Sequence, residues 1–85
     1  MLITWEIDPD IEGSETVDSA QAASELITDV LLNVFAEDDS MTRAHLMLNV
    51  AAPIHAGLVG PGTEAVERGE AWGAEVEPVR VRLEP

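Results

Sequence analysis

The 85-residue chain contains no cysteine and no lysine, and these absences exclude several classes of function. Without cysteine it can form neither disulfides nor thiolate metal sites. With only four basic residues it lacks the clusters that neutralise nucleic-acid phosphates, so we do not expect nucleic-acid binding. No apolar run approaches the roughly 18 residues of a membrane span, and no basic segment marks a secretion signal near Met1. We therefore expect a cytoplasmic protein without membrane contact.

Acidic residues are abundant and unevenly placed. Seventeen Asp and Glu residues give a formal net charge of −13, and no basic residue precedes Arg43. A field of this sign favours a basic surface on a protein partner. The alternative is that the composition, rich in Ala, Val and Glu, reflects a high-GC or salt-adapted proteome. The chain length fits a single domain, residues 1–85, with a core of modest stability.

The first elements are predicted to be a strand, a loop and the start of a helix. Leu2–Ile7 alternates between apolar and polar residues, as an opening strand does, and Pro9 ends it. Residues 8–18 are expected to form an acidic loop. Asp18 followed by Gln21 resembles a capping box that would begin a helix.

Two helices are predicted next. Residues 23–35 carry apolar side chains at helical spacing, and the acidic run 37–39 opposes the helix dipole and should end the first helix. Ser40 can cap a second helix over residues 41–52. A strand with alternating apolar residues over 44–50 is the alternative, but Leu, Met and Ala favour helix over strand.

The second half is predicted to contain two further strands and a short helix. Pro53 should end the second helix. Residues 54–59 are predicted to form a short strand, followed by a turn at residues 60–62. Thr63 can cap a third helix that extends to about Trp72.

The closing strand completes the predicted fold. Residues 79–83 alternate in the manner of a strand, and Pro78 limits its start to a sheet edge or a bulge. The expected architecture is α+β: a small two-layer sandwich in the order β-α-α-β-α-β, with a three-stranded antiparallel sheet and helices on one face.

Three segments carry a resemblance to a known family. They are LITDVLLNVF at 26–35, AHLMLNV at 44–50 and PVRVRLEP at 78–85. Their motifs and order resemble those of the ClpS adaptor family, small bacterial proteins that deliver N-degron substrates to an AAA+ Clp unfoldase and so regulate proteolysis. The resemblance covers about two thirds of the chain. It implies a protein-binding function, with a peptide N-terminus or the N-domain of a Clp-type unfoldase as partner.

The resemblance also implies site residues. Ile27, Met47 and Val50 would line an apolar pocket that takes the first side chain of the degron, although all three could be ordinary core residues. Ala51 stands where the family has a histidine that helps to hold the degron's α-amino group.

Acidic residues are the other candidates for binding. Asp8, Asp10 and Asp18 could supply carboxylates to an α-ammonium group, although a solvated loop with a helix cap also explains them. Glu64 and Glu67 are candidates for contact with the partner protein.

No pattern in the chain predicts catalysis or a bound cofactor. His45 and His55 lie ten residues apart on either side of Pro53, and neither belongs to a metal-binding motif. We therefore expect a non-enzyme with neither metal nor cofactor. The rival to the adaptor hypothesis is an acidic inhibitor or decoy, encoded by a phage or mobile element, that occludes a basic site. A third possibility is a domain that shares its topology with the C-terminal domain of the ribosomal stalk protein.

Overall fold

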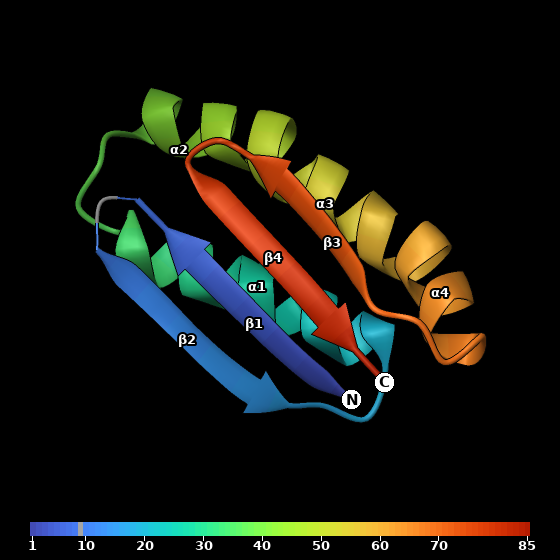
Figure 1. Ribbon diagram of the computed structural model, residues 1–85. Helices are drawn as coiled ribbons and strands as arrows, with labels where there is room; N and C mark the ends of the chain where they lie inside the picture. Colours follow the sequence, from blue (N-terminus) through green and yellow to red (C-terminus); the bar gives the residue numbers. More distant parts are fainter. Residues whose placement is uncertain (9) are drawn as a thin grey trace.

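The computed structural model describes residues 1–8 and 10–85 and shows an α+β protein built from two layers. Four strands form one antiparallel sheet, and the helices cover one of its faces (Figure 1). No helix in the described residues combines the length and apolar character needed to cross a membrane. The elements are β1 (Leu2–Ile7), β2 (Ile11–Thr16), α1 (Ala20–Val34), α2 (Ser40–Leu46), the π-helical η1 (Met47–Ala51), α3 (Ala52–Gly57), the π-helical η2 (Leu58–Gly62), α4 (Thr63–Glu67), β3 (Trp72–Val76) and β4 (Val79–Glu84).

The sheet consists of two hairpins that meet along β1 and β4, in the strand order β2-β1-β4-β3. Across the central pair, Ile3 lies opposite Leu83 and Ile7 lies opposite Val79. These four side chains are at most 2 % exposed and form the centre of the core. Because alternate residues of a strand point to opposite faces, Trp5 and Val81 also face the core, whereas Glu6, Arg80 and Arg82 face the open side of the sheet.

The prediction of a three-stranded sheet is wrong, because both edge strands were assigned to other structures. Residues 11–16, expected in a loop, form β2 and pair with every residue of β1. Trp72, expected at the end of the third helix, begins β3. No residue of β2 is buried, so the strand carries no apolar alternation from which it could be predicted.

β4 lies in the middle of the sheet, although Pro78 predicted an edge or a bulge. Pro78 precedes the strand, in the turn that joins β3 to β4, and follows a cis peptide bond with Glu77. Its carbonyl accepts a hydrogen bond from the Asp8 backbone N–H at 3.0 Å. Pro78, which has no N–H to donate, therefore lies outside the hydrogen-bonded ladder of the sheet. Val79 can pair with both neighbouring strands.

The first predicted helix is confirmed as α1, but the N-caps of the first two helices are one residue away from the predicted ones. Ser19, rather than Asp18, caps α1 and accepts a hydrogen bond from the Ala22 backbone N–H at 3.1 Å. Asp39, rather than Ser40, caps α2 and accepts from the Thr42 backbone N–H at 2.7 Å. This hydrogen bond holds the pKa of the Asp39 carboxyl below its ordinary value.

The largest departure from the prediction is a continuous helical rod over residues 40–67, here called the long helix, which contains α2, η1, α3, η2 and α4. Pro53 does not end it, the predicted strand 54–59 is helical, and the predicted turn at Gly60–Gly62 belongs to η2. A proline in a regular α-helix loses a hydrogen bond and clashes with the carbonyl four residues earlier. Pro53 follows η1 and Pro61 lies inside η2, where the wider turns of a π-helix accommodate the rings.

The π segments also keep one face of the long helix on the core. A row of buried residues recurs along it at every fourth position, as Val50, Ile54, Leu58 and Gly62, and Ala51 and Ala65 are buried beside this row. In a regular α-helix a step of four residues rotates the side chain by about 40° beyond a full turn, so this face would drift away from the sheet. The wider π turns offset that drift. A second row with the same spacing lies opposite the buried one, and we call it the outer row: Ala44, Leu48, Ala52, Ala56 and Gly60.

The long helix ends at Glu67, short of the predicted end at Trp72. Gly69 adopts a φ of +80°, as a glycine after a helix C-terminus often does, and its N–H donates to the Val66 carbonyl at 2.9 Å. The chain then turns into β3, and the Trp72 ring lies against Gly57 of the long helix. A Cβ at position 57 would lie only 2.5 Å from Trp72 Cζ2, so the glycine permits this close contact between helix and sheet.

Candidate functional site

A groove lies between α1 and the long helix on the surface that faces away from the sheet. It has a volume of about 270 Å³ and is lined by Thr28, Met47, Ala51, Ala52 and His55. Three of these side chains are apolar, and Met47 is half-buried. A flexible thioether flanked by small alanines gives a surface that can adapt to apolar groups of different shapes.

A hydrogen-bonded pair joins the two helical elements at one end of the groove. Ser24 is 2 % exposed, and its Oγ contacts Nδ1 of His55, which lies on the exposed side of the long helix. One turn further along α1, the Thr28 hydroxyl donates to the Ser24 carbonyl at 3.0 Å. The groove therefore has apolar walls made by Met47, Ala51 and Ala52 and polar groups from the His55 imidazole and the Thr28 hydroxyl.

The structure separates the three residues that were predicted to form the apolar pocket. Met47 lines the groove, whereas Ile27 and Val50 are 2 % and 4 % exposed and belong to the core beneath it. Ala51, which the resemblance to the ClpS family aligned with a histidine, lines the groove and is 5 % exposed. Of the three predicted pocket residues, only Met47 lines this groove.

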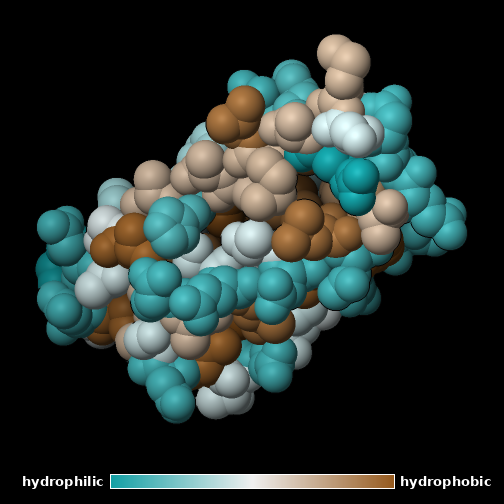
Figure 2. Space-filling view, turned by 180° about the vertical axis from the view of Figure 1, so that it is seen from behind, coloured by the Kyte–Doolittle hydropathy of each residue, from teal (hydrophilic) through white to brown (hydrophobic). Residues whose placement is uncertain are grey.

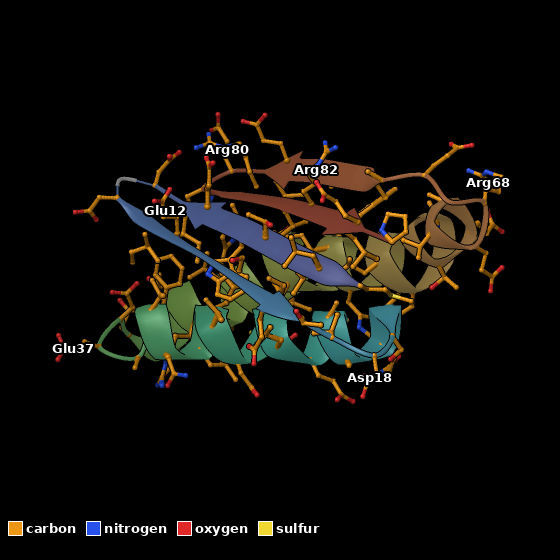
Figure 3. All side chains as sticks on the ribbon, turned by 60° about the horizontal axis from the view of Figure 1, so that its bottom comes forward. Glu12, Asp18, Glu37, Arg68, Arg80 and Arg82 are labelled. Carbon is orange, nitrogen blue, oxygen red and sulfur yellow. The ribbon has the colours of Figure 1, made fainter. Side chains whose placement is uncertain are left out.

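The predicted acidic residues do not converge on the groove. Asp8 and Asp10 lie between the end of β1 and the start of β2, and Asp8 accepts a hydrogen bond from Arg80 at 3.4 Å. Asp18 follows the other end of β2, and Figure 3 shows it far from Glu12 at the start of that strand. None of the groove's lining residues is a carboxylate.

The two glutamates predicted to contact a partner lie on the long helix. Glu64 and Glu67 are both exposed on α4, near its C-terminal end. They are distant in sequence from Met47 and do not line the groove.

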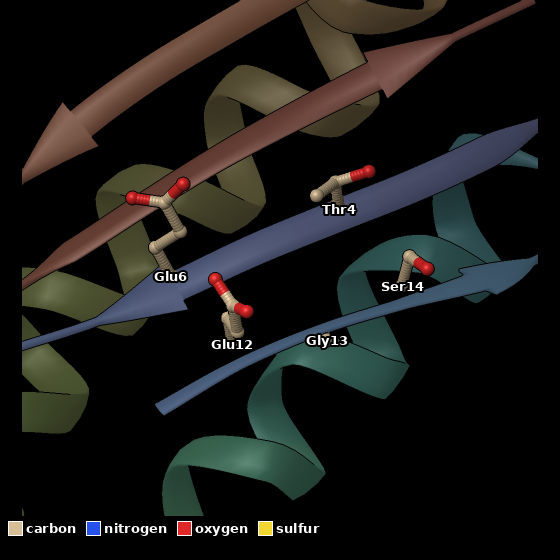
Figure 4. Close-up of a pocket in the computed structure, with 5 residues that line it drawn as sticks. All are labelled: Thr4, Glu6, Glu12, Gly13 and Ser14. Carbon is tan, nitrogen blue, oxygen red and sulfur yellow. The ribbon is translucent and has the colours of Figure 1, made fainter. Parts of the chain in front are cut away.

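A second hollow, of about 330 Å³, lies on the open face of the sheet above β1 and β2 (Figure 4). Thr4 lies opposite Ser14 there, and Glu6 lies opposite Glu12, while Gly13 contributes no side chain. Two carboxylates placed directly opposite each other repel. Arg80 on the neighbouring strand offsets this by donating to Glu6 from Nη2 at 2.8 Å and from Nε at 3.1 Å. The same hydrogen bonds raise the pKa of Arg80 above its ordinary value.

The surface of the long helix differs in charge from the rest of the molecule. No acidic residue occurs between Asp39 and Glu64, so all 17 acids lie outside this run. Met41 is 84 % exposed and Leu48 is 73 % exposed. Figure 2 shows an apolar band over this helical face, with hydrophilic side chains gathered on either side of it. The absence of acids was visible in the sequence and could have identified this surface.

His55, Ser24 and Thr28 were not predicted as site residues. His55 was placed beyond a helix end at Pro53, so its position on the same helix as Met47 could not be inferred. The pairing of Ser24 with a residue 31 positions later depends on how the two helical elements pack.

Within residues 1–8 and 10–85, no group of three or more His, Asp or Glu side chains is arranged to hold a metal ion. No protein-family model, curated protein or solved structure matches the chain. The function of the groove must therefore be inferred from its own geometry and chemistry.

Proposed function

We propose that the chain is a non-catalytic protein-binding domain whose groove between α1 and the long helix receives an apolar side chain of a protein partner. The observation that carries this proposal is the exposed, acid-free apolar surface around the groove in a chain of net charge −13. Apolar grooves with a few polar groups are the usual form of ligand sites. Covering such a surface releases about 25 cal/mol for each Å² of apolar area removed from water.

An adaptor role of the ClpS type is a specific form of this proposal, with a peptide N-terminus or the N-domain of a Clp-type unfoldase as the partner. The groove supplies the Thr28 hydroxyl and the His55 imidazole but no carboxylate. Asp8 and Asp10 lie between β1 and β2, and Asp18 lies after β2. A free α-ammonium in the groove would lack a charge-assisted hydrogen bond to a carboxylate. We therefore expect the groove to recognise the apolar side chain and to be indifferent to the free amino group.

The test is fluorescence anisotropy with short peptides that carry N-terminal Leu, Phe or Trp and a C-terminal fluorophore, each with a free and with an acetylated amino group. Both forms should bind with a dissociation constant below about 1 mM, equivalent to about −4 kcal/mol. Met47→Ala should weaken binding about tenfold, whereas Glu37→Gln, in the exposed turn after α1, should leave it unchanged.

The same titration separates the possible outcomes. Binding of the free-amine peptides alone would show an amine-capturing adaptor and contradict the indifference expected here. Failure of every peptide to bind below about 1 mM would overturn the groove as a side-chain site. Thermal unfolding of Met47→Ala checks that the variant is folded when its binding is measured.

A second candidate function is an acidic inhibitor or decoy that occludes a basic site. It is favoured by the hollow on the open sheet face, where Glu12 makes no ion pair within the described part of the chain while Glu6 is held by Arg80. We expect this function to depend on the acids of the hairpin rather than on Met47. The variant that tests it neutralises Asp8, Asp10, Glu12, Glu15 and Asp18.

The probe for this candidate is an arginine-rich peptide, and the control variant neutralises five acids elsewhere. If the inhibitor function holds, the hairpin variant should lose peptide binding while the control retains most of it. Equal losses of peptide binding in both variants would show attraction by net charge alone and would rule out a specific inhibitory surface on the hairpin. The control variant neutralises Glu25, Asp29, Glu37, Glu64 and Glu67.

A further inference from the structure

The outer row of the long helix is an apolar face that nothing in the described residues covers. Leu48 is 73 % exposed, and Ala44, Ala52 and Ala56 of the same row are also exposed. Met41, at 84 % exposure, adds a second large apolar side chain near the start of the helix. A side chain of this size left in water on a helix surface commonly marks an interaction site when its neighbours are also apolar.

The charge distribution indicates which partner fits this face. Each molecule carries a net charge of −13, so two copies repel each other in most orientations. The run between Asp39 and Glu64 contains no Asp, Glu or Lys, and Arg43 is its only Arg. Two copies can therefore approach with least repulsion when their long helices face each other.

The spacing of the outer row fits a symmetric, antiparallel pair. With a two-fold axis at Ala52, Leu48 of one copy lies opposite Ala56 of the other, so that a large side chain meets a small one. Ala44 lies opposite Gly60 in the same arrangement. Small residues on both sides let the helices approach closely.

The ends of the long helices are also complementary in this arrangement. The antiparallel orientation brings Arg43 of one copy toward Glu64 of the second copy, twice in each pair. In the single chain, neither side chain forms an ion pair with any other described residue. A parallel orientation would instead place the two Arg43 side chains near each other, which costs energy.

We infer that the outer row is a homodimer contact, in which the long helices of two copies pair antiparallel about a two-fold axis at Ala52. The helix of 28 residues is about 42 Å long at 1.5 Å per residue, close to the 40 Å long axis of the molecule. A seam one helix wide lies at the lower end of specific interfaces. The dimer is therefore expected to have a micromolar dissociation constant.

This inference does not depend on the proposed function, because the groove and the outer row share only Ala52 among the residues that define them. Met47→Ala should weaken peptide binding without changing the dimer. Leu48→Glu should abolish the dimer without changing peptide binding. Peptide binding by the groove and dimerisation through the outer row can thus be disproved independently.

The test is sedimentation velocity of the full chain over a concentration series from about 1 μM to about 1 mM, a range that spans micromolar affinity. The mass should rise from 9.1 kDa toward twice that value, and more readily at higher salt because repulsion is screened. Leu48→Glu should abolish the rise. Leu2→Glu, on the open sheet face, adds the same charge and should leave the rise intact.

A charge exchange tests the orientation. Arg43→Glu should weaken the dimer about tenfold by facing Glu64 of the second copy with a like charge, and the double variant with Glu64→Arg should restore it. A chain that stays monomeric throughout the series would overturn the inference. Equal loss of the dimer in Leu48→Glu and Leu2→Glu, or no rescue by the double variant, would overturn the antiparallel contact.

Discussion

At the scale of single residues, the pair formed by Ser24 and His55 shows how one polar contact fixes the two helical elements against each other. The Ser24 hydroxyl is buried, whereas the imidazole lies at the surface. A buried hydroxyl that loses its partner cannot be satisfied by water, but an exposed imidazole can. The two halves of the pair should therefore respond differently to substitution.

We predict that His55→Ala lowers the free energy of unfolding by about 1–3 kcal/mol, because it leaves the Ser24 hydroxyl unsatisfied. Ser24→Ala should cost only about 0.5–1.5 kcal/mol, the net value of a hydrogen bond. Urea unfolding of both variants and of the double variant checks this order, with the double variant close to Ser24→Ala. A larger loss for Ser24→Ala than for His55→Ala would contradict it.

At the scale of elements, the long helix depends on features that single-residue propensities do not capture. Two prolines and three glycines interrupt residues 53–62, and helix propensity predicts a break at such a sequence. The π segments accommodate the prolines, and the Trp72 ring occupies the space beside Gly57. Substitutions in this element should therefore follow packing rather than propensity.

We predict that Gly57→Ala destabilises the protein by about 1–3 kcal/mol, because its Cβ would overlap the Trp72 ring. Propensity alone predicts the opposite sign, since Ala is favoured over Gly in a helix by about 1 kcal/mol. The control is the same substitution in a Trp72→Phe background, where the overlapping six-membered part of the indole is gone. Chemical denaturation should show a much smaller cost there; an equal cost in both backgrounds would count against the overlap.

At the scale of the whole molecule, net charge is the dominant electrostatic feature. The ion pairs that Arg80 forms with Glu6, Asp8 and Glu75 are all exposed, and such pairs contribute little to stability. They cannot offset the self-repulsion of a chain with 17 acids and four bases. Screening by salt should therefore stabilise the folded state.

We predict that the midpoint of thermal unfolding rises as NaCl increases from about 0.01 M to about 0.1 M, where the Debye length falls from about 30 Å to about 10 Å. A gain of about 1 kcal/mol corresponds to about 4–8 °C for a chain of this size. Differential scanning fluorimetry at a concentration below that of the proposed dimer measures the shift. The variant with Glu12→Gln and Glu15→Gln should show a smaller rise, and a fall with salt in the parent chain would disprove the prediction.

The sequence by itself determined the α+β class, the strand Leu2–Ile7, the helix α1 and the closing strand, because the apolar residues of these elements repeat over their whole length. Only the tertiary structure decided that residues 11–16 form a strand, since their pairing partner β1 supplies the hydrogen bonds and no burial pattern marks them. It also decided that the chain passes Pro53 as a helix, because the wide turn of η1 and the core contacts of Ile54 outweigh the local tendency to break. Met47 was expected in a pocket only from the resemblance to the ClpS family, whereas His55 reached the same groove through long-range packing alone.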